Sequence, residues 1–240
     1  GRKFGMTKFA GIDINFGCPA HKVTKTGSGA ALMNNKKLSR EIIEIILKNT
    51  NLPVSIKIRS QVKNISAIEF VEFIKDLKIS AVMIHGRSLK QGFAGEIDFD
   101  MIKKIKQLLP NKIVLANGGI NNFKDAQEML KKTGADGLGI ARGAWGNPWI
   151  FDEIKKLRRN APRRVQKKEH TVACSYKKIK RAMMLHAKLF LKQQKMCGYE
   201  QNLEPLRKHL LLYCKGQNNA SELRRKIIKI ENLDELKKIL

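Results

Sequence analysis

The sequence predicts an α/β fold of the repeating βα type, and two patterns carry this prediction. Short apolar runs rich in Ile and Val alternate with amphipathic stretches, so the order along the chain is strand, helix, strand, helix. Polar or basic side chains follow nearly every apolar run. A regular βα order admits a doubly wound sheet or a (β/α)₈ barrel. Because barrel strands all end on one face, where active sites are built, the polar ends favour the barrel.

Five apolar runs are expected to form buried parallel strands. They are GIDIN at 11–15, VSIKI at 54–58, AVMIH at 81–85, IVLAN at 113–117 and GLGIA at 137–141. Ile and Leu recur at helical spacing between them, over 38–46, 65–74 and 102–109. A closed barrel needs eight strands, so we expect an incomplete (β/α)₈ TIM barrel made of the last five, with residues 1–10 as the tail of a preceding helix.

The pattern changes after Phe151, where a basic stretch containing proline precedes three segments with helical spacing. These segments are 175–196, 203–215 and 220–240. We therefore expect three parts: a partial TIM-barrel catalytic domain over 1–155, a basic linker over 156–174 and a small all-α domain over 175–240.

The charge balance favours a polyanionic partner. The chain has 48 Lys and Arg against 21 Asp and Glu, a formal net charge of +27. Residues 156–240 are the more basic part, which makes them the expected carrier of phosphate contacts in a nucleic-acid complex. The alternative is that the positive charge results from a composition biased toward Lys, Ile and Asn throughout the chain, and does not indicate a nucleic-acid partner.

The cysteines and the hydropathy pattern indicate a reduced, cytoplasmic protein. Cys18, Cys174, Cys197 and Cys214 show no C-x-x-C spacing, and no secretory signal stands at the start. No apolar run approaches the roughly 18 to 20 residues that cross a bilayer, so no membrane insertion is expected.

Several motifs together resemble the tRNA-dihydrouridine synthases. They are D-I-N-F-G-C-P at 13–19, H-K-V at 21–23, G-S-G-A-A-L at 27–32, V-S-I-K-I-R at 54–59, H-G-R at 85–87, N-G-G at 117–119, T-G-A-D-G at 133–137 and A-R-G-A-W-G-N-P-W-I-F at 141–151. R-K-H-L at 207–210 and S-E-L-R at 221–224 are similar to the family's helical tRNA-binding domain. The resemblance spans nearly the whole chain.

The resemblance implies reduction of the C5=C6 bond of uridine in tRNA. The hydride comes from FMN, NADPH reduces the flavin, no metal is involved, and a cysteine provides the proton. Cys18 occupies that cysteine's position. A thiol with an unperturbed pKa of about 8.5 is protonated at neutral pH and still gives up its proton to a developing carbanion. The alternative is a small buried hydrophobe, but Gly17 and Pro19 predict an exposed turn.

The resemblance assigns further residues to substrate and flavin. Asn15 is expected to bind the uracil or the flavin edge, the alternative being a turn cap. Lys57 is expected at the flavin N1/O2 region, because a buried ammonium needs an electron-rich partner, the alternative being a salt bridge to Asp13. His85 is implied as a flavin contact, with a structural histidine as the alternative, and Arg87 as a substrate contact.

Residues after the last two strands are expected to hold the FMN phosphate through backbone N–H groups. These are Asn117, Gly118, Gly119, Ala141 and Arg142. The family usually has Asp where Gly119 stands and Gly where Ala141 stands.

In the helical part, Arg207 and Lys208 are candidate tRNA contacts, with a solvated helix face as the alternative. Family members carry a P-M-A-like strand and a flavin-binding Gln ahead of the matched segment, and this sequence has neither. Three hypotheses remain: an active synthase, a catalytically incompetent RNA-binding remnant that lacks the first barrel strands, and a flavin barrel acting on free pyrimidines. The helical part argues against the third.

Overall fold

The computed structural model describes residues 9–159, 176–217 and 219–240. Contacts divide the chain into two compact units, Gly1–Gly143 and Ala144–Leu240. The segment from 144 to 155, expected with the first domain, is grouped with the helical unit by its contacts. The expected linker falls largely on residues 160–175, outside the described residues, as does most of the expected N-terminal helix tail.

The first unit is built on one five-stranded parallel sheet, at the five places that the sequence predicts. The strands are β1 (Ile12–Asn15), β2 (Val54–Arg59), β5 (Ala81–His85), β6 (Ile113–Asn117) and β7 (Gly137–Gly139). Their spatial order, β1-β2-β5-β6-β7, follows the chain without reversal. A doubly wound sheet reverses its order at a switch point, so this order is of the barrel type.

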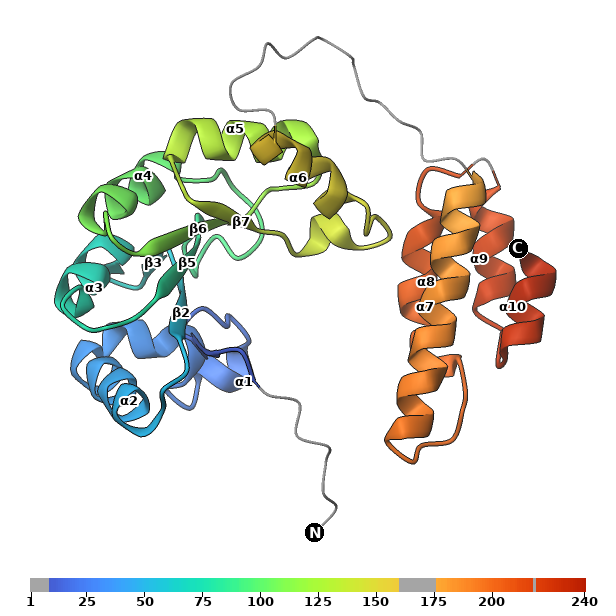
Figure 1. Ribbon diagram of the computed structural model, residues 1–240, viewed down its shortest axis with the longest axis horizontal. Helices are drawn as coiled ribbons and strands as arrows, with labels where there is room; N and C mark the ends of the chain where they lie inside the picture. The colour runs from blue at the N-terminus through green and yellow to red at the C-terminus, as the bar shows by residue number, and fades with distance from the viewer. Residues whose placement is uncertain (1–8, 160–175, 218) are drawn as a thin grey trace. The chain divides into compact units, whose positions relative to one another are not determined.

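Helices α2 (Lys36–Asn49), α3 (Ala67–Ile74), α4 (Phe99–Leu108) and α5 (Phe123–Thr133) follow one another along the outer side of the curved sheet (Figure 1). Val54, Ile56 and Ile58 of β2 are at most 1% exposed, as every second side chain of the strand turns toward the apolar core. Facing residues on the helices complete this core, among them Phe70, Ile74, Ile102, Ile105 and Met129. Burial of this apolar layer stabilises the unit.

Side-chain caps fix where the helices begin. Ser66 accepts a hydrogen bond from the backbone N–H of Glu69, which starts α3 at Ala67. The expected helix over 65–74 was therefore too long by two residues, because Ile65 and Ser66 form strand β4 (Ile65–Ser66), paired with β3 (Gln61–Val62). At the other end of the unit, Gly134 closes α5 in the left-handed conformation, at φ 65°.

The described part of the second unit is largely helical, and its first helix is α6 (Ile150–Arg159). Its core gathers α7 (Tyr176–Met196), α8 (Arg207–Leu210), α9 (Ala220–Ile227) and α10 (Leu233–Ile239), with 3₁₀ turns at Glu204–Leu206 and Leu211–Cys214. The single helix expected over 220–240 is two helices, because Asn232 caps a new N-terminus by accepting from the N–H of Glu235. Met183, Leu210 and Ile227 are fully buried in this core.

Candidate functional site

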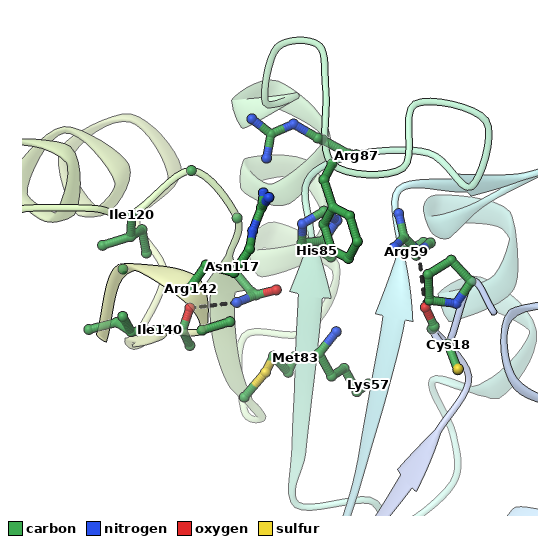
Figure 2. Close-up of a pocket in the computed structure, with 18 of the residues that line it drawn as sticks. Cys18, Lys57, Arg59, Met83, His85, Arg87, Asn117, Ile120, Ile140 and Arg142 are labelled. Carbon is green, nitrogen blue, oxygen red and sulfur yellow. Dashed lines mark hydrogen bonds between the residues drawn. The ribbon is translucent and has the colours of Figure 1, made fainter. Parts of the chain in front are cut away.

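The carboxyl ends of the five strands surround a cavity of about 730 Å³. Ten residues that the sequence singles out for chemistry line it: Asn15, Cys18, Lys57, His85, Arg87, Asn117, Gly118, Gly119, Ala141 and Arg142. Figure 2 shows several of them around the cavity, on different strands and loops. The parallel sheet thus brings together residues that are far apart in the sequence.

The sheet register stacks the cavity residues in two rows. Pairing across the strands aligns Asn15, Lys57 and Met83 in one row. Two residues further along the strands, Arg59, His85, Asn117 and Gly139 form the next row. Because side chains alternate between the faces of a strand, both rows point to the same side, opposite the helices.

Cys18 lies half-buried in a loop held by four hydrogen bonds. Asn15 accepts from the N–H of Gly17 through its side-chain oxygen, at 2.9 Å. The carbonyl of Cys18 accepts from the N–H of Ala30, and the N–H of Phe16 donates to the carbonyl of Lys57. The turn-capping alternative for Asn15 is therefore present in the structure, while its side-chain nitrogen has no hydrogen-bond partner among the described residues.

The fourth bond comes from Arg59, a residue to which the sequence analysis gives no role. Its side chain is 3% exposed. Nε donates to the carbonyl of Gly17 at 3.0 Å (Figure 2), and Nη1 donates to the carbonyls of Ser88 and Gly92 at 3.0 Å. The guanidinium thereby ties the cysteine loop to the loop that follows β5. The available signal in the sequence was an arginine at the end of a predicted buried strand. No sequence pattern predicts the three backbone carbonyls to which it donates.

Lys57 forms no ion pair within 4.0 Å among the described residues. Asp13, its candidate partner, accepts instead from the hydroxyl of Ser55 at 2.6 Å. Burial lowers the pKa of Lys57, and the charge of Arg59 adds to this effect. A Cβ atom placed on Gly17 would lie 3.6 Å from Lys57 Nζ, so the ammonium is adjacent to the cysteine loop. An electron-rich partner for the Lys57 ammonium would therefore be a ligand bound in the cavity.

His85 is 7% exposed, and its buried Nδ1 has no hydrogen-bond partner. Desolvation, and then the charges of Arg59 and Lys57, lower its pKa to about 4. The imidazole is therefore neutral at pH 7, with one nitrogen donating and the other accepting. A buried, unpartnered ring nitrogen beside a cavity is a ready contact for a bound polar group.

Arg87, Arg142 and Phe93 also line the cavity. The guanidinium of Arg142 lies 4.4 Å from the centre of the Phe93 ring. Arg87 Nε donates to the carbonyl of Gly95 at 2.8 Å, while its buried Nη1 has no partner. Both residues line the cavity, so each has charge available to a ligand there.

The residues expected around a phosphate lie at the ends of β6 and β7. Gly118 and Gly119 have positive φ values of 112° and 67°, conformations that glycine adopts without strain. Asn117 uses its side-chain nitrogen to donate to the carbonyl of Gly139 at 2.6 Å (Figure 2), a structural contact. Ala141 lies beyond β7, in the turn before a 3₁₀ helix at Arg142–Ala144.

The cavity is strongly cationic. Lys57, Arg59, Arg87 and Arg142 line it, and its lining includes no Asp or Glu. Cations held in a partly desolvated concave site attract an anionic ligand more strongly than exposed ones do. The site is therefore suited to a ligand with negative charge and polar edges.

The two candidate tRNA contacts in the helical unit differ in their surroundings. Arg207 Nε donates to the carbonyl of Ile230 at 2.7 Å, and Nη1 lies 3.6 Å from Glu204. Lys208 is exposed and makes no ion pair among the described residues. The side chain of Arg207 is thus committed to holding the helical unit together.

No described helix is long and apolar enough to span a membrane. No group of three or more His, Cys, Asp or Glu residues in the described ranges is arranged to hold a metal ion.

Comparison with known proteins agrees with the motifs. A family model described as dihydrouridine synthase matches residues 3–240. The chain is 31% identical over 226 residues to tRNA-dihydrouridine synthase B of Pseudomonas aeruginosa, covering 93% of this chain and 64% of that protein. It is 40% identical over 148 residues to a probable tRNA-dihydrouridine synthase of Rickettsia conorii, covering 60% and 44%.

A probable tRNA-dihydrouridine synthase of Synechocystis is 32% identical over 231 residues, covering 95% of this chain and 62% of that relative. The chain thus spans less than two thirds of the length of each of these curated relatives. Since the family model matches nearly every residue, the chain belongs to the dihydrouridine synthase family.

Proposed function

We propose that this chain is a tRNA-dihydrouridine synthase that uses FMN and NADPH to reduce the C5=C6 bond of uridine in tRNA. The observation that carries this proposal is that one cationic cavity gathers Cys18, Lys57 and His85 from three separate motifs. Family membership supports the same activity. We further infer that the five parallel strands are part of a (β/α)₈ barrel, because their order follows the chain without reversal.

The residues that line the cavity fit FMN. His85 Nδ1 and Arg87 Nη1 are buried polar atoms without partners, as expected of atoms that contact a polar ligand. The glycines at 118 and 119, with positive φ values, line the cavity without a Cβ that would crowd Ile97. The charge of Lys57 and Arg142 complements an anionic phosphate and an anionic reduced ring. We assign Lys57 and His85 to the isoalloxazine, and Asn117, Gly118, Gly119, Ala141 and Arg142 to the phosphate end.

Bound FMN, reduced by NADPH, would supply the hydride for C6 of the uracil. The protein's own step is proton donation at C5, which we assign to the thiol of Cys18. Hydrogen bonds to the carbonyls of Gly17 and Cys18 fix the loop, so the thiol is positioned before substrate arrives. Asn15 would orient the uracil edge through its free amide nitrogen, and Arg87 would contact the substrate from the cavity wall.

The helical unit is proposed as the tRNA-binding part, with Lys208 as an exposed contact. We assign Arg207 an indirect part in tRNA binding: its contacts within the helical unit shape the surface that carries Lys208.

The experiment that tests the proposal has two readings on the purified chain. FMN is titrated in and followed by its visible absorbance, and dihydrouridine is then measured in unmodified tRNA with NADPH. We expect saturable flavin binding and product formation. A chain that binds tRNA but binds no FMN and forms no dihydrouridine would support the RNA-binding remnant and contradict the synthase.

A further inference from the structure

The basic surplus of the helical unit is concentrated on one helix. Within Tyr176–Met196, α7 has seven Lys or Arg residues and no Asp or Glu. By contrast, α10 has two basic and two acidic residues, and α9 has three basic and one acidic. A composition bias that raised lysine everywhere would not by itself remove every carboxylate from a 21-residue helix. The surface of α7 is therefore the strongest candidate for an anionic partner.

A groove of about 380 Å³ lies along this helix, lined by residues of α7 and of the end of the chain. Four cations line it: Lys180, Arg181, Lys188 and Lys237. Its apolar lining is Met184, Leu185 and Leu240. Positions 180, 184 and 188 are four residues apart, so they form one stripe along the helix.

The charges in this groove make no ion pairs among the described residues, although Lys180 Nζ lies 4.6 Å from the centre of the Tyr176 ring. By contrast, Lys226 on α9 pairs with Glu222 at 2.6 Å. Leu185, between the cations, is 58% exposed. The groove thus offers free positive charge beside apolar surface.

We propose that this groove binds the sugar-phosphate backbone of the RNA substrate, which places the phosphate-binding surface on α7 and the end of α10. The proposal rests on the proposed function. From Lys180 to Lys188 the helix rises about 12 Å, so the cations are spread along a length that can meet more than one phosphate of a backbone. A repeating anion therefore fits the row of cations better than a single charge does. The apolar lining suits the ribose and base faces between phosphates.

The test compares two triple variants of the full chain with equal loss of charge. The groove variant is Lys180→Gln, Arg181→Gln and Lys188→Gln. The control variant is Lys215→Gln, Arg225→Gln and Lys229→Gln, which removes exposed cations outside the groove that also lack ion pairs among the described residues. Binding of an unmodified tRNA transcript is measured over a range of salt concentrations, and thermal unfolding confirms that each variant is folded.

The groove variant is expected to bind tRNA at least about tenfold more weakly near 0.15 M salt, with the slope of log K against log salt reduced by about 3. The control variant should keep most of the affinity. A second variant, Lys180→Arg with Lys188→Arg, retains the charge and should bind like the unchanged chain. If it binds as weakly as the glutamine variant, charge is not the basis of binding and the proposal fails.

Other outcomes separate this proposal from the function on which it rests. Equal weakening by the groove and control variants, with dihydrouridine still formed, would overturn the groove and leave the synthase standing. If the groove cations are required for anionic phosphatidylserine vesicles or a poly-glutamate peptide but not for tRNA, the partner is of another class and the RNA proposal is wrong. If the unchanged chain forms no dihydrouridine but its tRNA binding still depends on the groove, only the proposed function is overturned.

Discussion

The buried guanidinium of Arg59 donates a hydrogen bond to the carbonyl of Gly17, the residue directly before Cys18. The same group reaches two carbonyls of the loop after β5. One strand-end side chain therefore joins the loop of the proposed acid to a second wall of the cavity. The loop that holds Cys18 thus depends on a residue 42 positions after Gly17 in the sequence.

Arg59→Lys is expected to impair both folding and turnover. A lysine retains the charge but has no planar group that reaches three carbonyls, so buried acceptors lose their donor. We expect a loss of about 2 to 4 kcal/mol in the free energy of unfolding, measured in urea. Product formation should fall more than FMN affinity, because Arg59 holds the cysteine loop and the contacts assigned to the flavin come from other residues. Unchanged turnover would show that the cysteine loop holds its position without Arg59.

The lowered pKa of His85, about 4, predicts a dependence of stability on pH. Between about pH 6.5 and 4 the unfolded chain binds a proton at this histidine and the folded chain does not, so stability falls as pH falls through this window. The effect is on the order of 3 kcal/mol. Three charged groups act on the imidazole: Arg59, Lys57 and Arg87.

The measurement is urea unfolding at several pH values, with His85→Gln as the control. The pKa of His186 is also lowered by burial and contributes in the same direction. The difference between the unchanged chain and the His85→Gln variant isolates the part due to His85. If the two chains lose stability in parallel between pH 6.5 and 4, His85 titrates normally and the assignment of a neutral, buried imidazole is wrong.

Gly119→Ala should weaken FMN binding beyond its effect on stability. Gly134→Ala is the matched control, because the two glycines have φ values of 67° and 65°. Each change costs about 1 kcal/mol of backbone strain. A Cβ on Gly134 meets nothing within 4 Å, whereas one on Gly119 lies 3.2 Å from Ile97 and 3.8 Å from Arg87 Nη2. Equal FMN affinity in the two variants would remove Gly119 from the flavin site.

Gly119→Asp tests the departure from the usual family residue. Aspartate tolerates the left-handed conformation better than alanine does. Its carboxylate would be within reach of the guanidinium of Arg87, so the variant should be more stable than Gly119→Ala in thermal unfolding. If Gly119→Asp is no more stable than Gly119→Ala, the new carboxylate forms no ion pair with Arg87.

Arg207→Gln and Lys208→Gln should separate structure from RNA contact. Arg207 donates to the carbonyl of Ile230 and lies near Glu204, so its loss should lower the stability of the chain by about 1 to 2 kcal/mol. Lys208 is exposed, and its loss should change stability by less than about 0.5 kcal/mol. Urea unfolding of both variants decides this. Similar stabilities would mean that Arg207 is not structural.

The sequence predicts the five strands well because each is a short apolar run ending at a polar residue. It predicts helix boundaries less well. The cap at Ser66 and the break before Asn232 depend on single side-chain hydrogen bonds, which apolar spacing does not reveal. Residues 27–32, expected as part of a motif without a stated conformation, lie mostly in a 3₁₀ helix at Gly29–Asn34.

The candidate site was likewise predicted only in part. The strand ends identify which residues face the cavity, because parallel strands end at one edge of the sheet. What each side chain contacts could not be predicted, as with Arg59 and the carbonyl of Gly17, or Asn117 and the carbonyl of Gly139. These bonds join loops whose shapes are set only by the complete fold.

The central claim is that Cys18 gives the proton to uracil, and one comparison tests it most directly. Cys18→Ala and Cys197→Ala remove two half-buried free cysteines, one in the cavity and one in the helical unit. Dihydrouridine formation is measured for both in unmodified tRNA with NADPH, at equal FMN occupancy. The account predicts that Cys18→Ala binds FMN and tRNA but forms product at least about 100-fold more slowly, while Cys197→Ala is unaffected. Product formation by Cys18→Ala at the rate of the unchanged chain would contradict it.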